Sequence, residues 1–577
     1  MGRNTARFLD GNRGLLSFQW IRTAGEGRST RSEGTRPYSG SVRVAALDLG
    51  SNSFHLLVVE GGSDGSFVTL AREKEILGLG EVVARLGTLP PETYEQAAGC
   101  ARRLIAIAEA AGATRIVGCA TSALRDAFNG PALLAQLEAE TGVGVRVLSG
   151  EEEAALVFRA VQASVVIDPG PAVCLDLGGG SLEMAVGDAV SLQWAGSVGL
   201  GVGRITAELV RRDPPSSGDL RRLADRVAEE LSVVRSEVLA LGPQLLIGTS
   251  GTMCDLGRMA AVQRGGSVPA GVHQLVVGRQ ELKAIHRRLV RQSLADRRRL
   301  PGLDARRAAW APAGSLVALA AMDAFGLDEL TVGEWALREG IVLGSLARTP
   351  AAAPGDGRSL RRDSVVELGR RCRFHEAHAR HVAKLATELF DVTALVHRLG
   401  AADRELLELG ALLHDVGEHV SRDGHHRHGA YLIEHGRLRG LPPADVDVLA
   451  SLCRFHRRGE PKPAFPPFGR LSGRRRDEVR ALVGILRVAD ALDRSRAKLV
   501  RQVTMGDVAR GSIRLVVAAA GEAELELSEA QRRAALLARC FGRRMVISPA
   551  TTAAAAGRAW SAVPISTIPQ STGWPPG

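Results

Sequence analysis

Two short stretches of this chain share a pattern of residues that could bind phosphate. VAALDLGSNSFHLLVVE (44–60) and AVCLDLGGGSLEMAVGD (172–188) each contain an apolar run, Asp-Leu-Gly, two small residues, a serine and a second apolar run. A tight turn of this kind leaves backbone N–H groups pointing outward, and glycine lets that backbone approach an anion closely. The hydroxyls of Ser51, Ser53 and Ser181 add further donors.

An aspartate ends the first apolar run of each stretch. Asp48 and Asp176 can hold Mg²⁺ through water, because this cation favours carboxylates and phosphate oxygens. One such loop alone would be better explained as a glycine turn in a hairpin. Two copies at corresponding positions of two similar domains instead predict a clamp that closes on a phosphate chain from both sides.

The elements around these turns indicate an α/β protein with a different C-terminal part. Residues 42–149 alternate strands with helices, and a second α/β unit begins near 172. A Pro/Ala/Gly-rich linker follows near 347–359, and residues 363–500 are helical and rich in His, Asp and Arg. Between 502 and 548 the runs RQVTMGDV, SIRLVVAA, AELELS and RRMVISP predict short strands around one helix.

Composition limits the possible functions. A length of 577 residues predicts several domains, and an aromatic content of 4% argues against a stacking platform for single-stranded nucleic acid. The net charge of +11 comes almost entirely from arginine, which would attract a polyanionic substrate. Seven scattered cysteines without a C-x-x-C pair, and no apolar run long enough for a membrane span, predict a cytoplasmic protein with reduced thiols.

A third Gly/Ser/Thr loop, LLIGTSGTM (245–253), follows another apolar strand. Together the three loops resemble the phosphate-1, phosphate-2 and adenosine motifs of the actin, sugar-kinase and heat-shock-chaperone ATPase superfamily. The chain is most similar there to the exopolyphosphatase and guanosine-pentaphosphate phosphohydrolase family. The resemblance covers about 42–345, and its motifs are DLGSNSFH (48–55), ATSALRDA (120–127), SGEEEA (149–154), DLGGGSLE (176–183), GTSGT (248–252) and LREG (337–340).

The resemblance implies catalytic roles for three residues. Glu153 would be the base that accepts a proton from the attacking water, with Glu152 as the alternative, and Arg125 would contact phosphate. Without the resemblance, GEEEA would be better explained as a solvated first helical turn, where acids favour the positive end of the helix dipole. Asp176 and Glu183 correspond to the Mg²⁺-binding acids.

The remaining expected ligands are backbone and side-chain groups of the loops. His55 is expected to pack beneath the first turn instead of binding. The expected phosphate-binding residues are Gly50, Ser51, Asn52, Ser53, Thr121, Ser122, Gly178, Gly179, Gly180, Ser181, Gly248, Ser250 and Gly251.

Three functions remain open at this point. The first is a Mg²⁺-dependent exopolyphosphatase, and the second is a guanosine-pentaphosphate phosphatase on the same scaffold. The third is a regulator that holds polyphosphate or nucleotide without efficient catalysis. The arginine excess favours a long polyanion, and a sugar or acetate kinase is disfavoured because the SGEEEA segment has no role there.

The helical region resembles the HD metal-dependent phosphohydrolase domain. Its ordered motif is His378, the pair His414-Asp415 and the later Asp490. Two imidazoles and two carboxylates suit Mn²⁺, Fe²⁺, Zn²⁺ or Mg²⁺. The alternative is a metal-free domain for dimerisation and polymer binding. Further histidines that could serve a second metal are His425, His426, His428 and His456.

The predicted fold is two duplicated actin-like (ribonuclease-H-like) α/β domains, an all-α HD-type domain and a small α+β C-terminal segment. The expected partners are polyphosphate or guanosine pentaphosphate, no membrane, no specific nucleic acid and a second copy of the chain. The predicted segments are a disordered arm (1–41), actin-like domains I (42–160) and II (161–346), a linker (347–362), the helical domain (363–500), the α+β segment (501–548) and a disordered tail (549–577).

Overall fold

The computed structural model describes residues 42–62, 67–346, 357–509 and 511–550. The predicted arm, most of the predicted linker and nearly all of the predicted tail lie outside these residues. Contacts between α-carbons divide the chain into two compact units. Of the described residues, the first unit contains those from Val42 to Phe374 together with Val416–Ala450, and the second contains His375–Asp415 and those from Ser451 to Ala550. The domain boundaries expected from the sequence stay predictions.

The first sheet carries the first Asp-Leu-Gly turn between its two central strands. β1 pairs with β2 antiparallel and with β4 parallel, so the ends of β1 and β4 meet at the same edge. The sheet has the order β3-β2-β1-β4-β5. Its strands are β1 Val42–Leu49, β2 Ser53–Gly61, β3 Phe67–Ile76, β4 Arg115–Ala120 and β5 Val145–Val147.

The second sheet repeats this arrangement. Its order is β10-β11-β9-β6-β7-β8, in which β8-β7-β6-β9-β11 matches the order and strand directions of the first sheet. The duplicated α/β fold predicted from the two turns is therefore confirmed. The strands are β6 Ala172–Leu177, β7 Leu182–Gly187, β8 Leu192–Val198, β9 Leu245–Thr249, β10 Val276–Gly278 and β11 Glu329–Val332.

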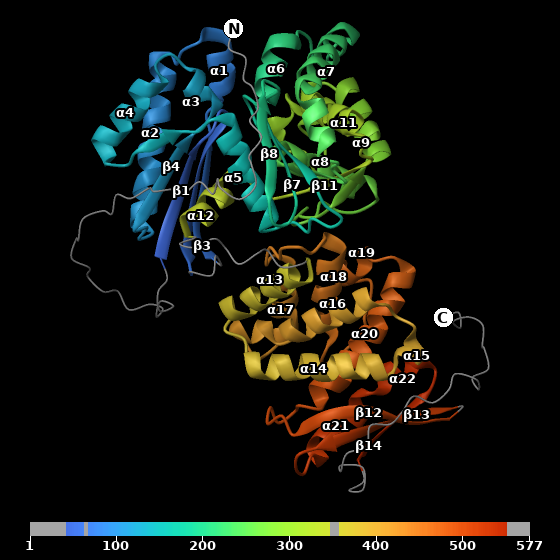
Figure 1. The fold of residues 1–577 in the computed structure, drawn as a ribbon. Helices are drawn as coiled ribbons and strands as arrows, with labels where there is room; N and C mark the ends of the chain where they lie inside the picture. Colours follow the sequence, from blue (N-terminus) through green and yellow to red (C-terminus); the bar gives the residue numbers. More distant parts are fainter. Residues whose placement is uncertain (1–41, 63–66, 347–356, 510, 551–577) are drawn as a thin grey trace. The chain divides into compact units, whose positions relative to one another are not determined.

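Two helices lie between the sheets (Figure 1). α5 (Gly150–Gln162) packs on β7 and β8, whereas α12 (Leu337–Leu346) packs on β1 and β2, and the two helices pack on each other. The outer helices are α1 Leu79–Leu86, α2 Pro91–Ala110, α3 Ser122–Asp126, α4 Gly130–Thr141, α6 Val202–Leu209, α7 Ser217–Ala240, α8 Ser250–Gln263, α9 Arg279–Arg291, α10 Leu294–Arg297, η1 Ala305–Arg307 and α11 Ala311–Phe325.

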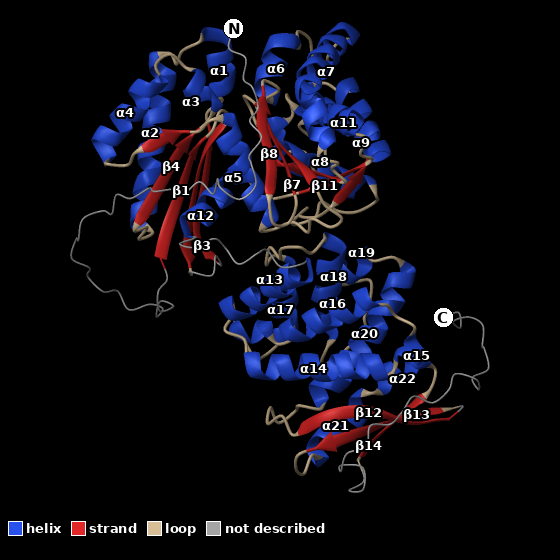
Figure 2. Ribbon diagram, viewed as in Figure 1, coloured by secondary structure: helices blue, strands red, loops and turns tan. Residues whose placement is uncertain are grey.

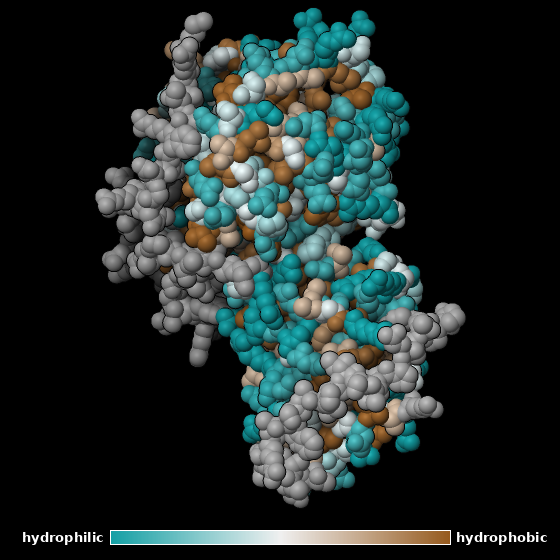
Figure 3. Space-filling model, turned by 45° about the vertical axis from the view of Figure 1, so that its right-hand side comes forward, coloured by the Kyte–Doolittle hydropathy of each residue, from teal (hydrophilic) through white to brown (hydrophobic). Residues whose placement is uncertain are grey.

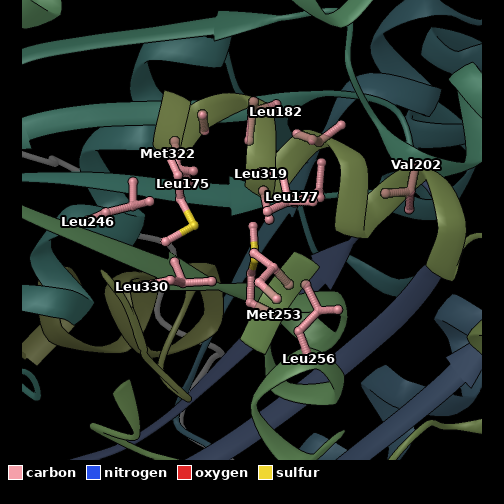
Figure 4. Close-up of a cluster of buried hydrophobic side chains, with 14 of the residues drawn as sticks. Leu175, Leu177, Leu182, Val202, Leu246, Met253, Leu256, Leu319, Met322 and Leu330 are labelled. Atoms are coloured by element: carbon pink, nitrogen blue, oxygen red, sulfur yellow. The ribbon is translucent and has the colours of Figure 1, made fainter. Parts of the chain in front are cut away.

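The central strands are buried on both faces, as expected for a sheet covered by helices on each side. Leu175 and Leu177 of β6 pack with Leu246, Met253 and Met322 on one face (Figure 4). The alternate residues of β6 pack with α5 and α12 on the other face. Because both faces are fixed by packing, the turn that follows β6 has a defined position.

Along the chain, the described elements between Gly357 and Ala491 are all helices (Figure 2). In the second compact unit, α14 packs on α16 and α20. The helices of this region are α13 Gly357–Arg371, α14 Glu376–Val392, α15 Ala394–His397, α16 Ala401–Leu413, η2 Val416–His419, α17 His425–Glu434, α18 Pro443–Phe455, α19 Pro466–Arg470 and α20 Gly473–Ala491.

The C-terminal segment differs from the prediction at one element. AELELS was expected to be a strand, but it forms the start of α21 (Glu524–Arg533). A run of only six alternating polar and apolar residues is also compatible with a helix. In α21, Glu526, Glu529 and Ala530 share one buried face. The other elements are β12 Val500–Ala509, β13 Ser512–Ala519, α22 Ala535–Phe541 and β14 Arg544–Pro549, with the sheet order β12-β13-β14.

Polar side chains are common on the one face of the molecule that Figure 3 draws. Hydrophilic side chains cover most of the face drawn in Figure 3, and hydrophobic ones are scattered between them. Among the described residues, none of the helices has the length and apolar character needed to cross a bilayer.

Candidate active site

The two Asp-Leu-Gly turns meet in the first compact unit. A Cβ added to Gly179 would lie 3.1 Å from Cβ of Asn52, and one added to Gly180 would lie 2.9 Å from Oγ of Ser51. The Gly180 position would also be only 2.3 Å from Oγ of Ser122. The glycines therefore allow a close approach of three loops that the sequence pattern had assigned to one phosphate site.

Four carboxylates lie around this meeting point. In the strand register Asp48 pairs with His55, and Asp176 pairs with Glu183. Glu153, on the first turn of α5, completes the set, and its side chain is only 7% exposed. We refer to Asp48, Glu153, Asp176 and Glu183 as the acid cluster.

The acid cluster holds excess negative charge. Burial, and to a smaller extent the nearby Asp176, raises the pKa of Asp48 to about 7, although Arg338 opposes this shift. Burial likewise raises the pKa of Glu183 to about 7. The pKa of Glu153 lies well above its ordinary value because of burial and then of repulsion from Glu183, Asp176 and Asp48. Such a cluster favours a cation.

The two adjacent glutamates of α5 have different environments. Glu152 accepts a hydrogen bond from the Ser149 backbone N–H at 3.0 Å and contacts Arg146, so it caps the helix. Glu153 faces the acid cluster, and its Oε2 is buried without a hydrogen-bond partner among the described residues. Adjacent helical positions point about 100° apart, which separates the two alternatives left open by the sequence. The alternative role of Glu152 as the base stays a prediction.

Several buried polar atoms near the turns lack hydrogen-bond partners within the part of the chain that the structure describes. A buried polar group without a partner costs about 1–3 kcal/mol, so a cluster of them indicates a missing ligand. All of these atoms belong to residues singled out by the sequence motifs. They are Asp48 Oδ1, Asn52 Oδ1, Ser122 Oγ, Glu153 Oε2 and Ser250 Oγ.

The loop after β4 contributes a cation and hydroxyls. Nη1 of Arg125 donates to the Leu148 carbonyl at 2.7 Å, and the charge of Arg125 lowers the pKa values of Glu153 and Glu183. Thr121 is buried at the start of α3. Arg125 is therefore near the acid cluster, where its remaining donors could bind phosphate.

The third loop is only partly suited to phosphate binding. Gly248 lies within β9, where an added Cβ would come within 2.9 Å of Leu330 and Met253. This glycine therefore permits packing between strands and helix, and the expected phosphate role of Gly248 stays a prediction. Ser250 differs, because it has a φ of 88° and a buried Oγ without a partner among the described residues. Gly251 adjoins the Arg307 guanidinium.

Sequence reasoning missed residues that orient the acids. Thr249 donates to Oδ1 of Asp176 at 2.8 Å, and Ser197 donates to Oε1 of Glu183 at 3.0 Å. The charge of Arg338 partly opposes the rise that burial causes in the pKa values of Asp48 and Asp176. Thr249 and Arg338 lie in the GTSGT and LREG motifs, whereas no motif pointed to Ser197. The oriented oxygen donors fit Mg²⁺.

A second cluster lies in the other compact unit and contains the expected HD residues. Nε2 of His414 is 3.5 Å from Asp415 and 3.6 Å from Asp490, and Nε2 of His378 is 3.8 Å from each of these aspartates. His456 adds a third imidazole, with its Nε2 3.5 Å from Asp415. We refer to these five residues as the histidine centre.

Hydrogen bonds fix the orientation of each imidazole in the histidine centre. Nδ1 of His414 is 2.7 Å from the Ala411 carbonyl, and Nδ1 of His456 is 2.7 Å from the Cys453 carbonyl. Nδ1 of His378 is 2.7 Å from the carboxylate of Asp493. Each Nδ1–H is thus donated outward, which leaves the Nε2 lone pairs for a metal.

Cations balance the carboxylates of the histidine centre. Arg496 lies 2.7 Å from Asp415, and Arg533 lies 2.8 Å from Asp490. Burial alone would lower the pKa of His414, but Asp415 and Asp490 outweigh burial and raise it to about 9. Mixed nitrogen and oxygen donors suit a divalent metal. The second metal site expected from His425, His426 and His428 stays a prediction.

Comparisons with known proteins agree with this architecture. Residues 58–349 match the model of the Ppx/GppA phosphatase family, and residues 360–530 match the model of Ppx/GppA phosphatase, domain III. "Exopolyphosphatase 1" of Mycobacterium leprae is 33% identical over 326 residues, which are 56% of this chain and 94% of that protein. "Exopolyphosphatase 1" of Mycobacterium tuberculosis strain H37Rv is 34% identical over 327 residues, which are 56% of this chain and 93% of that protein.

A solved structure supports the fold independently. An exopolyphosphatase from Cytophaga hutchinsonii superimposes with a TM-score of 0.50 at 24% identity, covering 53% of this chain and 97% of that one. This likeness concerns the fold alone. The family models, by contrast, account for both the duplicated α/β part and most of the C-terminal part. The chain therefore belongs to the Ppx/GppA phosphatase family.

Proposed function

We propose that the protein is an exopolyphosphatase that removes the terminal phosphoryl group of inorganic polyphosphate with Mg²⁺ and Glu153. The observation that carries the proposal is the position of Glu153. Its buried Oε2 has no hydrogen-bond partner within the described part of the chain, and three further acids raise its pKa where two phosphate-type turns meet. Family membership supports a phosphatase in general, and the two mycobacterial relatives are named exopolyphosphatases.

The proposed reaction is a hydrolysis in which Glu153 accepts a proton. The water oxygen forms a bond to the terminal phosphorus, and the bond from that phosphorus to the bridging oxygen breaks. Glu153 takes the water proton, and the products are orthophosphate and a chain one unit shorter. Arg125, Ser122 and the backbone N–H groups of the turns stabilise the charge on the transferred phosphoryl oxygens.

The acid cluster has a separate task in this scheme. Asp48, Asp176 and Glu183 would hold the cation, which would neutralise phosphate charge when bound. Thr249 and Ser197 keep two of these carboxylates oriented. Burial and the neighbouring carboxylates raise the pKa of Glu153, which makes this carboxylate a stronger proton acceptor.

The substrate is proposed to be polyphosphate instead of a guanine nucleotide. The net charge of +11 favours a long polyanion. The similar mycobacterial proteins are also named exopolyphosphatases. Guanosine pentaphosphate hydrolysis is the alternative.

A substrate panel tests the choice. Purified protein is given long polyphosphate or guanosine pentaphosphate, each with Mg²⁺ or with EDTA, and released phosphate is measured. We expect Mg²⁺-dependent release from polyphosphate at a higher kcat/KM than from the nucleotide. Faster release from the nucleotide would favour the alternative. Tight binding of polyphosphate without release would favour a regulator.

We further propose that the histidine centre binds a divalent metal, namely Mn²⁺, Fe²⁺, Zn²⁺ or Mg²⁺. The support is the convergence of the Nε2 atoms of His378, His414 and His456 on the carboxylates of Asp415 and Asp490. A metal-free structural role is the alternative. A cytoplasmic location and a homodimer complete the proposal.

A further inference from the structure

Three side chains behind the first turn form a continuous line of contacts. Nη1 of Arg338 is 3.2 Å from Nδ1 of His55, and Nε2 of the same imidazole is 2.8 Å from Oγ of Ser53. Ser53 and His55 lie on β2, two residues apart and hence on the same face. Arg338 lies on α12, which packs on that strand.

The direction of each hydrogen bond follows from the groups involved. A guanidinium can only donate, so Nδ1 of His55 must accept from Arg338 and cannot carry a proton. The proton of the neutral imidazole is therefore on Nε2, which donates to Oγ of Ser53. Burial, followed by the charges of Arg338 and Lys74, lowers the pKa of His55 well below its ordinary value, in agreement with a neutral ring.

This order of bonds leaves the Ser53 hydroxyl with a defined task. Because Oγ accepts from His55, its own hydrogen is available for a different acceptor. Ser53 follows Asn52, whose Cβ lies at the meeting point of the two turns, and the unpartnered Asn52 Oδ1 marks the same region as a ligand site. A hydroxyl that accepts from a polarised donor also becomes a stronger donor.

The far end of the line is held firmly. Glu339, next to Arg338, is fully buried and pairs with Arg72 of β3 at 2.8 Å. It also accepts a hydrogen bond from the Ala336 backbone N–H at 3.1 Å, which fixes the first turn of α12. Arg338 is thereby set against His55 by the helix and by the sheet.

We propose that Arg338 and His55 are positioning residues that hold the Ser53 hydroxyl as a fixed hydrogen-bond donor to a phosphoryl oxygen of polyphosphate. The inference rests on the proposed function. It assigns a role to the LREG motif, and it gives His55 a purpose beyond packing beneath the turn.

A double-mutant cycle tests the proposal. Ser53→Ala, His55→Phe and the double variant are compared with the wild-type protein in kcat and KM for long polyphosphate. We expect each single change to reduce kcat/KM about 10- to 100-fold, as for a lost hydrogen bond to a charged group. The double variant should be no worse than Ser53→Ala, because both changes remove the same donor.

The conservative variant His55→Gln separates positioning from packing. Its amide can accept from Arg338 and donate to Ser53, so kcat/KM should recover to within a few-fold of wild type. In the His55→Gln protein, a further Ser53→Ala change should again lower kcat/KM about 10- to 100-fold. This second cycle decides the question even if His55→Phe lowers the melting temperature.

Two results would overturn the proposal. One is additive losses for Ser53→Ala and His55→Phe, and the other is full kcat/KM in Ser53→Ala. Either would leave the exopolyphosphatase assignment intact, since wild type would still release phosphate. A wild-type protein that releases no phosphate from polyphosphate would instead refute the proposed function itself.

Discussion

The acid cluster and the histidine centre both bury carboxylates, but they balance the charge differently. Within the described residues, no arginine or lysine forms an ion pair with a member of the acid cluster, and burial raises all four pKa values. In the histidine centre, Arg496 and Arg533 pair with Asp415 and Asp490. There His414 and His456 outweigh burial and lower the pKa of Asp490.

This difference indicates which region depends on a ligand. The acid cluster concentrates negative charge that Arg125 and Arg338 offset only in part, so a bound cation would relieve the remaining repulsion. In the histidine centre, Arg496 and Arg533 already balance the charge of the aspartates. This centre can therefore keep its geometry with or without a bound metal. The main reaction should therefore be sensitive to changes in the acid cluster and insensitive to changes in the histidine centre.

The largest expected effect comes from neutralising one acid. Glu153→Gln keeps the shape of the side chain but removes the base, and we expect kcat for polyphosphate to fall about 10²- to 10⁴-fold. Glu152→Gln is the matched control, because this neighbour caps α5 and should retain activity within a few-fold. Unchanged phosphate release in Glu153→Gln would end the catalytic assignment.

Asp176→Asn should sharpen the comparison through the metal requirement. Residues that only hydrogen-bond to a metal ligand typically change metal affinity about 10- to 100-fold when they are mutated. Loss of a direct ligand should therefore raise the Mg²⁺ concentration for half-maximal activity by at least this much. Asp126→Asn serves as the control, because Asp126 lies at the end of α3 and is not a member of the acid cluster. An unaltered Mg²⁺ titration would show that Asp176 is not a ligand.

The histidine centre offers the reverse experiment. Asp493→Asn weakens the support of His378, and we expect metal affinity to fall about tenfold or more while polyphosphate hydrolysis is retained. Metal analysis of protein purified under reducing, metal-replete conditions provides the measurement. If the wild-type protein carried no metal there, the histidine centre would have a structural role. The acid cluster and the histidine centre would then differ as a catalytic site differs from a packed core.

The smallest expected effect is a pH dependence of stability. The pKa of Asp48 rises from its ordinary 3.8 to about 7 in the folded protein, so the folded state binds more protons than the unfolded state between these values. The associated stability is fully present below about pH 4 and is lost as pH rises through 7. Without Mg²⁺, Asp48→Asn should therefore flatten the fall in melting temperature between pH 5 and 8. An identical pH profile in the variant would contradict the assigned shift.

Much of the fold could be predicted because local patterns and global packing agree. The repeated Asp-Leu-Gly turns predicted the duplication, and the two sheets repeat one strand order. The short AELELS run failed because a two-residue period over six residues does not exclude a helix, and burial of one helical face decided the outcome. The prediction for Gly248 stays open, and its position within β9 shows that a glycine in a loop motif can also serve packing.

The sequence by itself determined the two phosphate-type turns, the acidic helix start and the ordered His/Asp motif, because these depend on residue type and spacing. Only the tertiary structure separated Glu153 from Glu152, since the direction of a side chain depends on how α5 packs between the sheets. The same holds for Arg338 and Ser197, which are remote from the turns in sequence. Folding brings them together because distant strands and helices share one buried face.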